Sequence, residues 1–238
     1  MEILQRFLVC CLLSGISLAF AKQNLIIFVP VKKDFPGVAP YVRIVDRLTT
    51  RMGYAANLVD DLPTARARLD LISGRLDGVL GMSDANIAEF GSQASAMTIP
   101  LFESRIDVFS REPFVYRNLE SLKGHTVGTR RIDAPAGILS NRPGIILYAA
   151  NDEASAIRML FAGRTELLIL NRIIFQAGLL QLEKREIIPY YTSEEPFLRP
   201  KNFLVLSNKF REKIPQFDAM LRQMIADGEY EKLLKGKL

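Results

Sequence analysis

Two short polar pairs in this chain each follow a run of apolar residues, which makes them candidates for contact with a solute. Ser83-Asp84 follows the run 78–82, and Asn171-Arg172 follows the run 167–170. Together, a hydroxyl, a carboxylate, an amide and a guanidinium offer both donors and acceptors of hydrogen bonds. The side chains therefore predict recognition of a small molecule with polar groups.

The same succession of elements precedes both pairs. A helix is expected from about residue 63 to 72, and Gly74 stands where a helix commonly ends in the left-handed conformation. The run 78–82 has the unbroken hydrophobicity of a buried strand. A helix ending near residue 161, a turn and the run 167–170 repeat this order. Ligands of open α/β sheets bind beyond the carboxyl ends of the strands, so two facing sheets would enclose a cleft between the pairs.

Other candidate contacts follow from the same placement rule. The apolar run 24–29 predicts a first strand with a loop at its end, and 125–128 predicts a strand in the second half. The alternating segment 105–110 predicts a strand that crosses out of the first lobe, and 202–206 one that returns. The candidate ligand-binding residues are Asp34, Phe35, Ser83, Asp84, Arg105, Thr129, Arg130 and Asn171.

The N-terminus has the features of a secretory signal peptide. Residues 7–20 are mostly apolar, and small residues at 19 and 21 predict cleavage after Ala21. An exported, periplasmic protein is expected. Both cysteines, Cys10 and Cys11, lie in the segment to be removed, so the mature chain should have no disulfide and no cysteine metal site.

Composition narrows the classes of partner. The 238 residues carry a formal net charge of +5, and no run of Lys and Arg alternates with aromatic residues, which argues against nucleic acid as a partner. No stretch after the signal peptide approaches the roughly 20 apolar residues of a membrane helix. No metal or cofactor motif is present, and a soluble monomer is expected.

Four segments in order resemble one known family. They are Gly78–Ser83 (GVLGMS), Leu119–Gly128 (LESLKGHTVG), Gly163–Asn171 (GRTELLILN) and Ser207–Leu234, which contains ADGEY. They resemble the bacterial extracellular solute-binding proteins of family 3, which serve amino-acid ABC transporters. The resemblance covers essentially the whole mature chain. It implies an α/β fold with two lobes, joined by two crossing strands, that close on a small ligand. The first lobe would comprise 22–109 plus 199–238, and the second 110–198.

Two departures from the family pattern affect the ligand. Amino-acid binders of this family have an arginine five residues after the Ser or Thr of the first motif, and this chain has Ala88. They end the second buried strand with an aspartate, and this chain has Asn171. Arginine grips a carboxylate and aspartate pairs with an ammonium group. A small polar solute, anionic ones included, is therefore expected rather than a standard α-amino acid, with an ABC permease or a membrane sensor as partner.

Two other functions remain open. A few proteins of this fold, such as cyclohexadienyl dehydratase, are enzymes, and that role would require an acid or base in the cleft, for which Glu103, Glu194 and His125 are candidates. A module that acts only through protein contacts is the other alternative. No Ser-His-Asp set, Walker loop or dinucleotide glycine motif favours a further enzyme class, so a binding protein is the first expectation.

Overall fold

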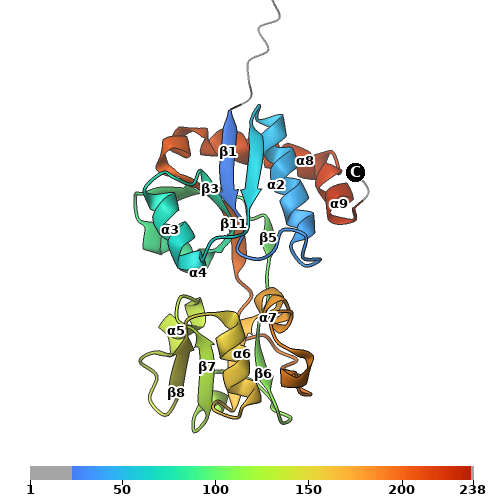
Figure 1. Cartoon of the computed structure of the whole chain (residues 1–238). Helices are drawn as coiled ribbons and strands as arrows, with labels where there is room; N and C mark the ends of the chain where they lie inside the picture. Colours follow the sequence, from blue (N-terminus) through green and yellow to red (C-terminus); the bar gives the residue numbers. More distant parts are fainter. Residues whose placement is uncertain (1–22, 237–238) are drawn as a thin grey trace, which may run out of the picture.

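A computed structural model describes residues 23–236, which form two separate sheets arranged one beyond the other (Figure 1). The expected signal peptide lies outside the described residues. Each sheet is mixed, with three parallel strands and antiparallel strands beside them. The predicted α/β fold with two lobes is confirmed.

The first sheet has the order β2-β1-β3-β11-β4, and β5 also pairs with β11. Its strands are β1 (Asn24–Phe28), β2 (Ala55–Val59), β3 (Gly78–Ser83), β4 (Ala94–Ala96), β5 (Phe102–Glu103) and β11 (Lys201–Ser207). Strands β1, β2 and β3 are parallel, and β11 runs antiparallel to β3. The unbroken apolar run of β3 is explained by this position, because β3 is central and helices cover both faces.

Helices on the two faces of the first sheet build two hydrophobic clusters. The helices are α2 (Ala39–Arg51), α3 (Thr64–Ile72), the short α4 (Asp84–Ile87), α8 (Ile214–Ala226) and α9 (Glu229–Leu234), with 3₁₀ helices η1 (Ala88–Phe90) and η4 (Asn208–Lys213). Leu48 of α2 and Phe217 of α8 are fully buried on one face, and Leu71 of α3 is fully buried on the other. Figure 1 shows α2, α8 and α9 together on one side of the lobe.

The second sheet has the order β10-β6-β9-β7-β8. Its strands are β6 (Ile106–Ser110), β7 (Thr126–Arg130), β8 (Ile146–Ala150), β9 (Leu167–Asn171) and β10 (Tyr191–Thr192). The helices are α5 (Ala134–Leu139), α6 (Glu153–Phe161) and α7 (Arg172–Leu179), with 3₁₀ helices η2 (Leu119–Leu122) and η3 (Lys184–Glu186). The stacked rings of Phe109 and Phe175, with centroids 3.8 Å apart, join β6 to α7.

The strand pairing moves one expected boundary. β6 pairs along its whole length with β9, so residues 106–109 belong to the second sheet and not to the first, where the expected limit at 109 would leave them. Alternation of apolar residues predicts a strand but does not tell which sheet it joins. We propose lobe limits of 23–103 with 201–236 and of 106–198.

The apolar pair at 187–188 predicts a short strand at residues 186–189, but the chain forms no strand there. Glu183 and Glu186 form a reciprocal capping box around η3, in which the Glu183 N–H donates to Glu186 Oε2 at 2.7 Å. These local hydrogen bonds favour a 3₁₀ turn over an extended strand. The strand β10 begins later, at Tyr191.

Two chain segments cross between the lobes and run side by side. The Ser104 N–H donates to the Pro200 carbonyl at 3.0 Å, and the Ile106 N–H donates to the Leu198 carbonyl at 3.0 Å. Beside them the buried Asp107 accepts hydrogen bonds from Arg105 Nε at 2.5 Å and Arg172 Nε at 2.6 Å. The connection between the lobes is therefore a paired hinge and not two independent linkers.

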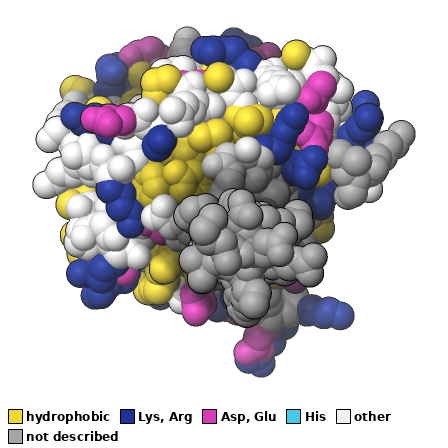
Figure 2. Space-filling view, turned by 90° about the horizontal axis from the view of Figure 1, so that it is seen from above, with side chains coloured by type: hydrophobic (Ala, Val, Ile, Leu, Met, Phe, Trp, Pro, Cys, Tyr) yellow, Lys and Arg dark blue, Asp and Glu magenta, His cyan; other side chains and the backbone are white. Residues whose placement is uncertain are grey.

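Basic side chains are dispersed over the end of the first lobe. On the face shown in Figure 2 the Lys and Arg side chains stand apart around the rim, with acidic side chains among them. A nucleic-acid backbone requires a continuous basic surface, and this face does not present one. None of the helices within residues 23–236 combines the length and the apolar character needed to cross a bilayer.

Candidate ligand cleft

A cavity of about 120 Å³ lies between the two sheets. The first sheet contributes Phe28 and Ser83, which end β1 and β3, and the second contributes Arg130 and Asn171, which end β7 and β9. The strand ends thus meet from both sides, because the parallel strands of each sheet point toward the other lobe (Figure 1). This is the place where open α/β sheets bind ligands.

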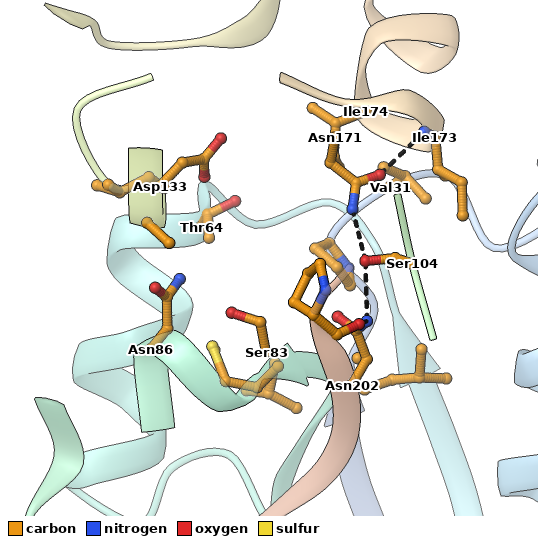
Figure 3. A pocket seen from close by; sticks show the side chains of 18 of the residues that line it. Val31, Thr64, Ser83, Asn86, Ser104, Asp133, Asn171, Ile173, Ile174 and Asn202 are labelled. Carbon is orange, nitrogen blue, oxygen red and sulfur yellow. Dashed lines mark hydrogen bonds between the residues drawn. The ribbon is translucent and has the colours of Figure 1, made fainter. Parts of the chain in front are cut away.

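Most of the cavity wall is apolar. Val31, Val79, Leu80 and Ile174 are buried residues that line it, together with Phe102 from β5. Polar side chains project between them, and Figure 3 shows Ser83 and Asn86 on the side formed by the first lobe. A wall of this kind holds an apolar body and orients it by a few hydrogen bonds.

A chain of amide and hydroxyl groups closes the hinge side of the cavity (Figure 3). Asn171 caps α7, because its Oδ1 accepts from the Ile173 N–H at 2.9 Å, and its Nδ2 donates to Ser104 Oγ at 3.0 Å. Asn202 Nδ2 donates to the same oxygen at 2.9 Å. The chain therefore links β9 of one sheet to β11 of the other through the crossing segment.

Arg130 is a buried cation held by two carboxylates. Its Nε and Nη2 donate to the two oxygens of Asp133 at 2.9 and 2.8 Å, and its Nη1 donates to Glu153 Oε2 at 3.2 Å. Burial alone would lower the pKa of the guanidinium, but the Asp133 and Glu153 carboxylates raise it. The positive charge is thus offset within the second lobe, which reduces what Arg130 can offer to an anionic ligand.

A hydrogen bond from Arg68 joins the lobes across the cleft. Arg68 of α3 donates from Nη2 to the Ile132 carbonyl at 3.2 Å, in the loop after β7. A second cavity, of about 500 Å³, opens beside this contact and shares Arg68, Asn86 and Asp133 with the first. A ligand bound between the lobes would therefore have a neighbouring space on the side of α3 and α5.

Solved structures identify the architecture. A mutant of ArgBP from T. maritima aligns with a TM-score of 0.69 at 16% identity, over 90% of this chain and 94% of that one. The substrate-binding protein of an amino acid ABC transporter aligns with a TM-score of 0.69 at 16% identity, over 91% and 99%. A histidine kinase sensor domain described as similar to periplasmic binding proteins gives 0.70 at 18%, over 91% and 96%.

The chain has the periplasmic binding protein fold. No family model matches it, and no curated protein matches it either. At identities this low, the likeness to solved structures establishes the fold alone. The ligand has to be argued from the residues of this chain.

Within this periplasmic binding protein fold, three predicted site residues meet at the cavity. Ser83, Arg130 and Asn171 all line it. They share one property, which is that each is the last residue of a strand whose carboxyl end points to the other lobe. The position of a residue at a strand end was therefore the most informative signal in the sequence.

The other five predicted residues do not line either cavity. Asp34 is exposed in the loop after β1, and Phe35 packs against the hydrophobic core. Asp84 is exposed and accepts from the neighbouring Ala85 N–H. Arg105 is bound to Asp107, and Thr129 is fully buried one residue before the strand end. Successive side chains of a strand point to opposite faces of the sheet, so Thr129 points to the face opposite that of Arg130.

Several lining residues were not predicted. They are Thr64, Arg68, Asn86, Ser104, Asp133 and Asn202. Two of them, Ser104 and Asn202, could have been predicted from the sequence, because they are polar residues within or beside the predicted crossing strands. Thr64 and Arg68 had none, since their approach to the cleft depends on how α3 packs over the sheet.

The acid and base candidates lie away from both cavities. Glu103, Glu194 and His125 are absent from their linings. His125 instead lies at the start of β7, where its Nδ1 is 3.6 Å from Glu166 and its ring packs edge-on against Phe114. Across residues 23–236 no group of three or more His, Cys, Asp or Glu side chains is arranged to hold a metal ion.

Proposed function

We propose that this protein is a periplasmic solute-binding protein that holds a small molecule between its two lobes. The observation that carries the proposal is the cavity at the meeting point of strand ends from both sheets, lined by Ser83 on one side and Asn171 on the other. Supporting it, two of the similar structures are ArgBP and a substrate-binding protein of an amino acid ABC transporter. Export to the periplasm rests on the predicted signal peptide.

The cavity favours a solute with an apolar body and few polar groups. Its volume of about 120 Å³ is close to that of engineered cavities, of about 150 Å³, that accept benzene. The charge of Arg130 is offset by Asp133 and Glu153. A solute of about one ring in size, with one or two hydrogen-bonding groups, matches these walls best.

A standard α-amino acid fits this cleft poorly. Ala88 is exposed on η1 and does not line the cavity, so no side chain at that position is available to a carboxylate. The Asn171 amide is uncharged and already caps α7 and binds Ser104. The two charge partners that an amino-acid zwitterion requires in a desolvated site are therefore missing from these two positions.

Delivery to an ABC permease or signalling to a membrane sensor would both use such a cleft. The similar structures include one protein of each kind, a transporter's substrate-binding protein and a kinase sensor domain. In both settings the solute is released unchanged. This distinguishes the proposal from an enzyme of the same fold, which would convert it.

Thermal unfolding in the presence of small solutes tests the proposal. A solute at 100 times its Kd should stabilise the folded chain by about 2.7 kcal/mol. Ser83→Phe should abolish the effect, because the new ring fills the cavity. Ser92→Phe makes the same change at an exposed turn of the first lobe and should keep it.

The solute should then be recovered intact by mass spectrometry. Conversion of the solute would favour a cleft enzyme. Stabilisation that survives in the Ser83→Phe variant would show that the solute binds elsewhere, and the proposal would fail.

A further inference from the structure

Ser104 is a buried hydroxyl whose two acceptor positions are both used. It lies between β5 and β6, is 6% exposed and lines the cavity. Its Oγ accepts from Asn171 Nδ2 at 3.0 Å and from Asn202 Nδ2 at 2.9 Å, and Figure 3 shows the two amides reaching the oxygen from opposite sides. A hydroxyl oxygen has two acceptor lone pairs and one proton to donate. The hydroxyl proton of Ser104 therefore still needs an acceptor.

Backbone partners fix which atom of each amide faces Ser104. Asn171 Oδ1 accepts from the Ile173 N–H, so its Nδ2 faces the hydroxyl. Asn202 Nδ2 also donates to the Pro200 carbonyl at 3.0 Å, so a flipped amide would set two oxygens against each other. Both bonds to Ser104 are therefore donated by the amides, and the serine does not donate its own proton to either of them.

Within residues 23–236 no protein acceptor takes the Ser104 proton. With both lone pairs engaged, the O–H bond takes the remaining tetrahedral direction, and Ser104 is one of the residues that line the cavity. We propose that Ser104 donates this hydrogen bond to an acceptor atom of the bound solute, such as a carbonyl, carboxylate or ether oxygen. The inference rests on the proposed function and narrows its ligand class.

This arrangement makes the hinge a determinant of specificity. A solute without an acceptor would displace water from the hydroxyl and leave a buried O–H unpaired, which is costly. A solute with an acceptor atom takes the Ser104 proton. Every hydrogen-bonding position of Ser104, which links Asn171 to Asn202 between the lobes, is then satisfied. The acceptor atom of the solute is thus recognised at the paired hinge that connects the lobes.

Matched probes separate this role from a structural one. Cyclohexanone and methylenecyclohexane, and likewise acetophenone and α-methylstyrene, differ only in an oxygen replaced by a methylene group. The ratio of the two affinities within a pair cancels any general damage that a variant suffers. For the wild-type chain we expect the carbonyl member to bind about fivefold tighter, the net value of one neutral hydrogen bond.

Two variants should remove this preference in different ways. Ser104→Ala deletes the donor. Asn171→Asp keeps the cap of α7 but offers a carboxylate oxygen that takes the Ser104 proton. Both should bring the ratio close to one. Asn208→Asp makes the same change at an exposed position of η4 and should leave the ratio unchanged.

Each outcome of the titrations decides a separate point. Equal binding of the two members of a pair by the wild-type chain, or a carbonyl preference that survives both Ser104→Ala and Asn171→Asp, overturns the inference and leaves the proposed function standing. If none of the four probes stabilises the wild-type chain, this inference fails, and the proposed function is decided separately by the thermal screen with other solutes.

Discussion

Arg130, beneath the cavity, is a buried charge with a structural role. Arg130 is 8% exposed and makes three hydrogen bonds to Asp133 and Glu153. Gln181 Nε2 donates to the remaining oxygen of Glu153 at 2.8 Å. The cluster joins the end of β7 to α6 and to the turn after α7, so its first role is to hold the cavity floor in place.

Removing the cation should therefore cost stability. Arg130→Leu leaves two partly buried carboxylates without their partner, and we expect the free energy of unfolding to fall by about 3 kcal/mol. Urea denaturation monitored by circular dichroism measures the change. Arg131→Leu alters the next residue, which is exposed and whose side chain donates to the Ala149 carbonyl at 3.3 Å, and should cost less than about 0.5 kcal/mol. Equal losses in both variants would contradict the structural role of the cluster.

At the residue level, sequence patterns located strand ends better than they located side chains. Ser83 and Asn171 were expected at the cleft because each follows a buried apolar run, and Arg130 because it follows a predicted strand; all three line the cavity. Asp34 and Phe35 were expected at the cleft because their loop follows β1, but the residues of that loop that line the cavity are Pro30, Val31 and Val38. Arg68 reaches the cleft from a helix face, and no pattern of residue types predicts how far an arginine on that face extends.

At the scale of elements, β3 owes its shape to one glycine. Between two pairs with β11, Val79 with Val205 and Met82 with Phe203, β3 uses one more residue than its partner. Gly81 lies in this bulge with φ +77°. A Cβ at Gly81 would be 3.1 Å from Cζ of Phe102, a ring that lines the cavity. The bulge lets this ring pack against the strand.

Gly81→Ala should therefore affect both stability and binding. The left-handed conformation alone costs about 1–2 kcal/mol with a side chain, and crowding of Phe102 should add about 1 kcal/mol. Gly74→Ala is the matched control, since Gly74 has φ +74° and nothing within 4 Å of an added Cβ. We expect Gly81→Ala, but not Gly74→Ala, to weaken solute binding in thermal-shift titrations. Equal losses of unfolding free energy would show that Phe102 is not crowded.

The C-terminal helix α9 is attached through acid-sensitive contacts. The Asp227 carboxylate accepts from the Glu229 N–H at 3.0 Å and from Arg51 Nη1 at 3.1 Å. The Glu229 backbone hydrogen bond and the Arg51 guanidinium lower the pKa of this carboxyl, against the opposing effect of burial. A carboxyl with a lowered pKa in the folded state stabilises the fold above its ordinary pKa, near 4, and loses this contribution as pH falls through the folded value.

Asp227→Asn should remove this part of the acid response. The asparagine oxygen can still accept from Glu229, but it does not titrate. Unfolding midpoints measured from pH 6 to pH 2 should therefore fall less steeply below about pH 4 for this variant than for the wild-type chain. Glu212→Gln makes the same type of change at an exposed position and should follow the wild-type curve. A variant curve parallel to the wild type would contradict the assignment.

Elements were predicted more completely than their assembly. The helices near 64–72 and 153–161 and the strands ending at Ser83 and Asn171 lie where apolar periodicity placed them. Strand β6 was expected as a strand, but its pairing with β9, and so the sheet it joins, is a long-range property that the local pattern does not give. The apolar pair at 187–188 favours a strand, but the chain forms the 3₁₀ helix η3 just before it. The capping box of Glu183 and Glu186 explains this difference, because its local hydrogen bonds favour the 3₁₀ turn.

At the scale of the whole molecule, the second lobe is an insertion in the first. The chain leaves the first sheet after β5 and returns in β11, and β5 and β11 pair with each other, so exit and return are adjacent. The paired hinge lies on one side of the cavity. On the other side the hydrogen bond from Arg68 to the Ile132 carbonyl joins α3 to the loop after β7. The cavity thus lies between the paired hinge, where the chain itself connects the lobes, and a hydrogen bond between the lobes.

The Arg68 contact should set how far the lobes open. The chain from Lys22 onward has no cysteine, so Leu69→Cys on α3 and Ser140→Cys after α5 place spin labels at two exposed positions on this side of the cleft. Adding Arg68→Ala removes the guanidinium that reaches Ile132, and the distance distribution between the labels, measured by double electron–electron resonance, should broaden and shift to longer values. Arg66→Ala is the control, because Arg66 binds Asp70 within its own helix at 3.0 Å. If the distribution does not change in the Arg68→Ala variant, the hydrogen bond from Arg68 to Ile132 does not set how far the lobes open.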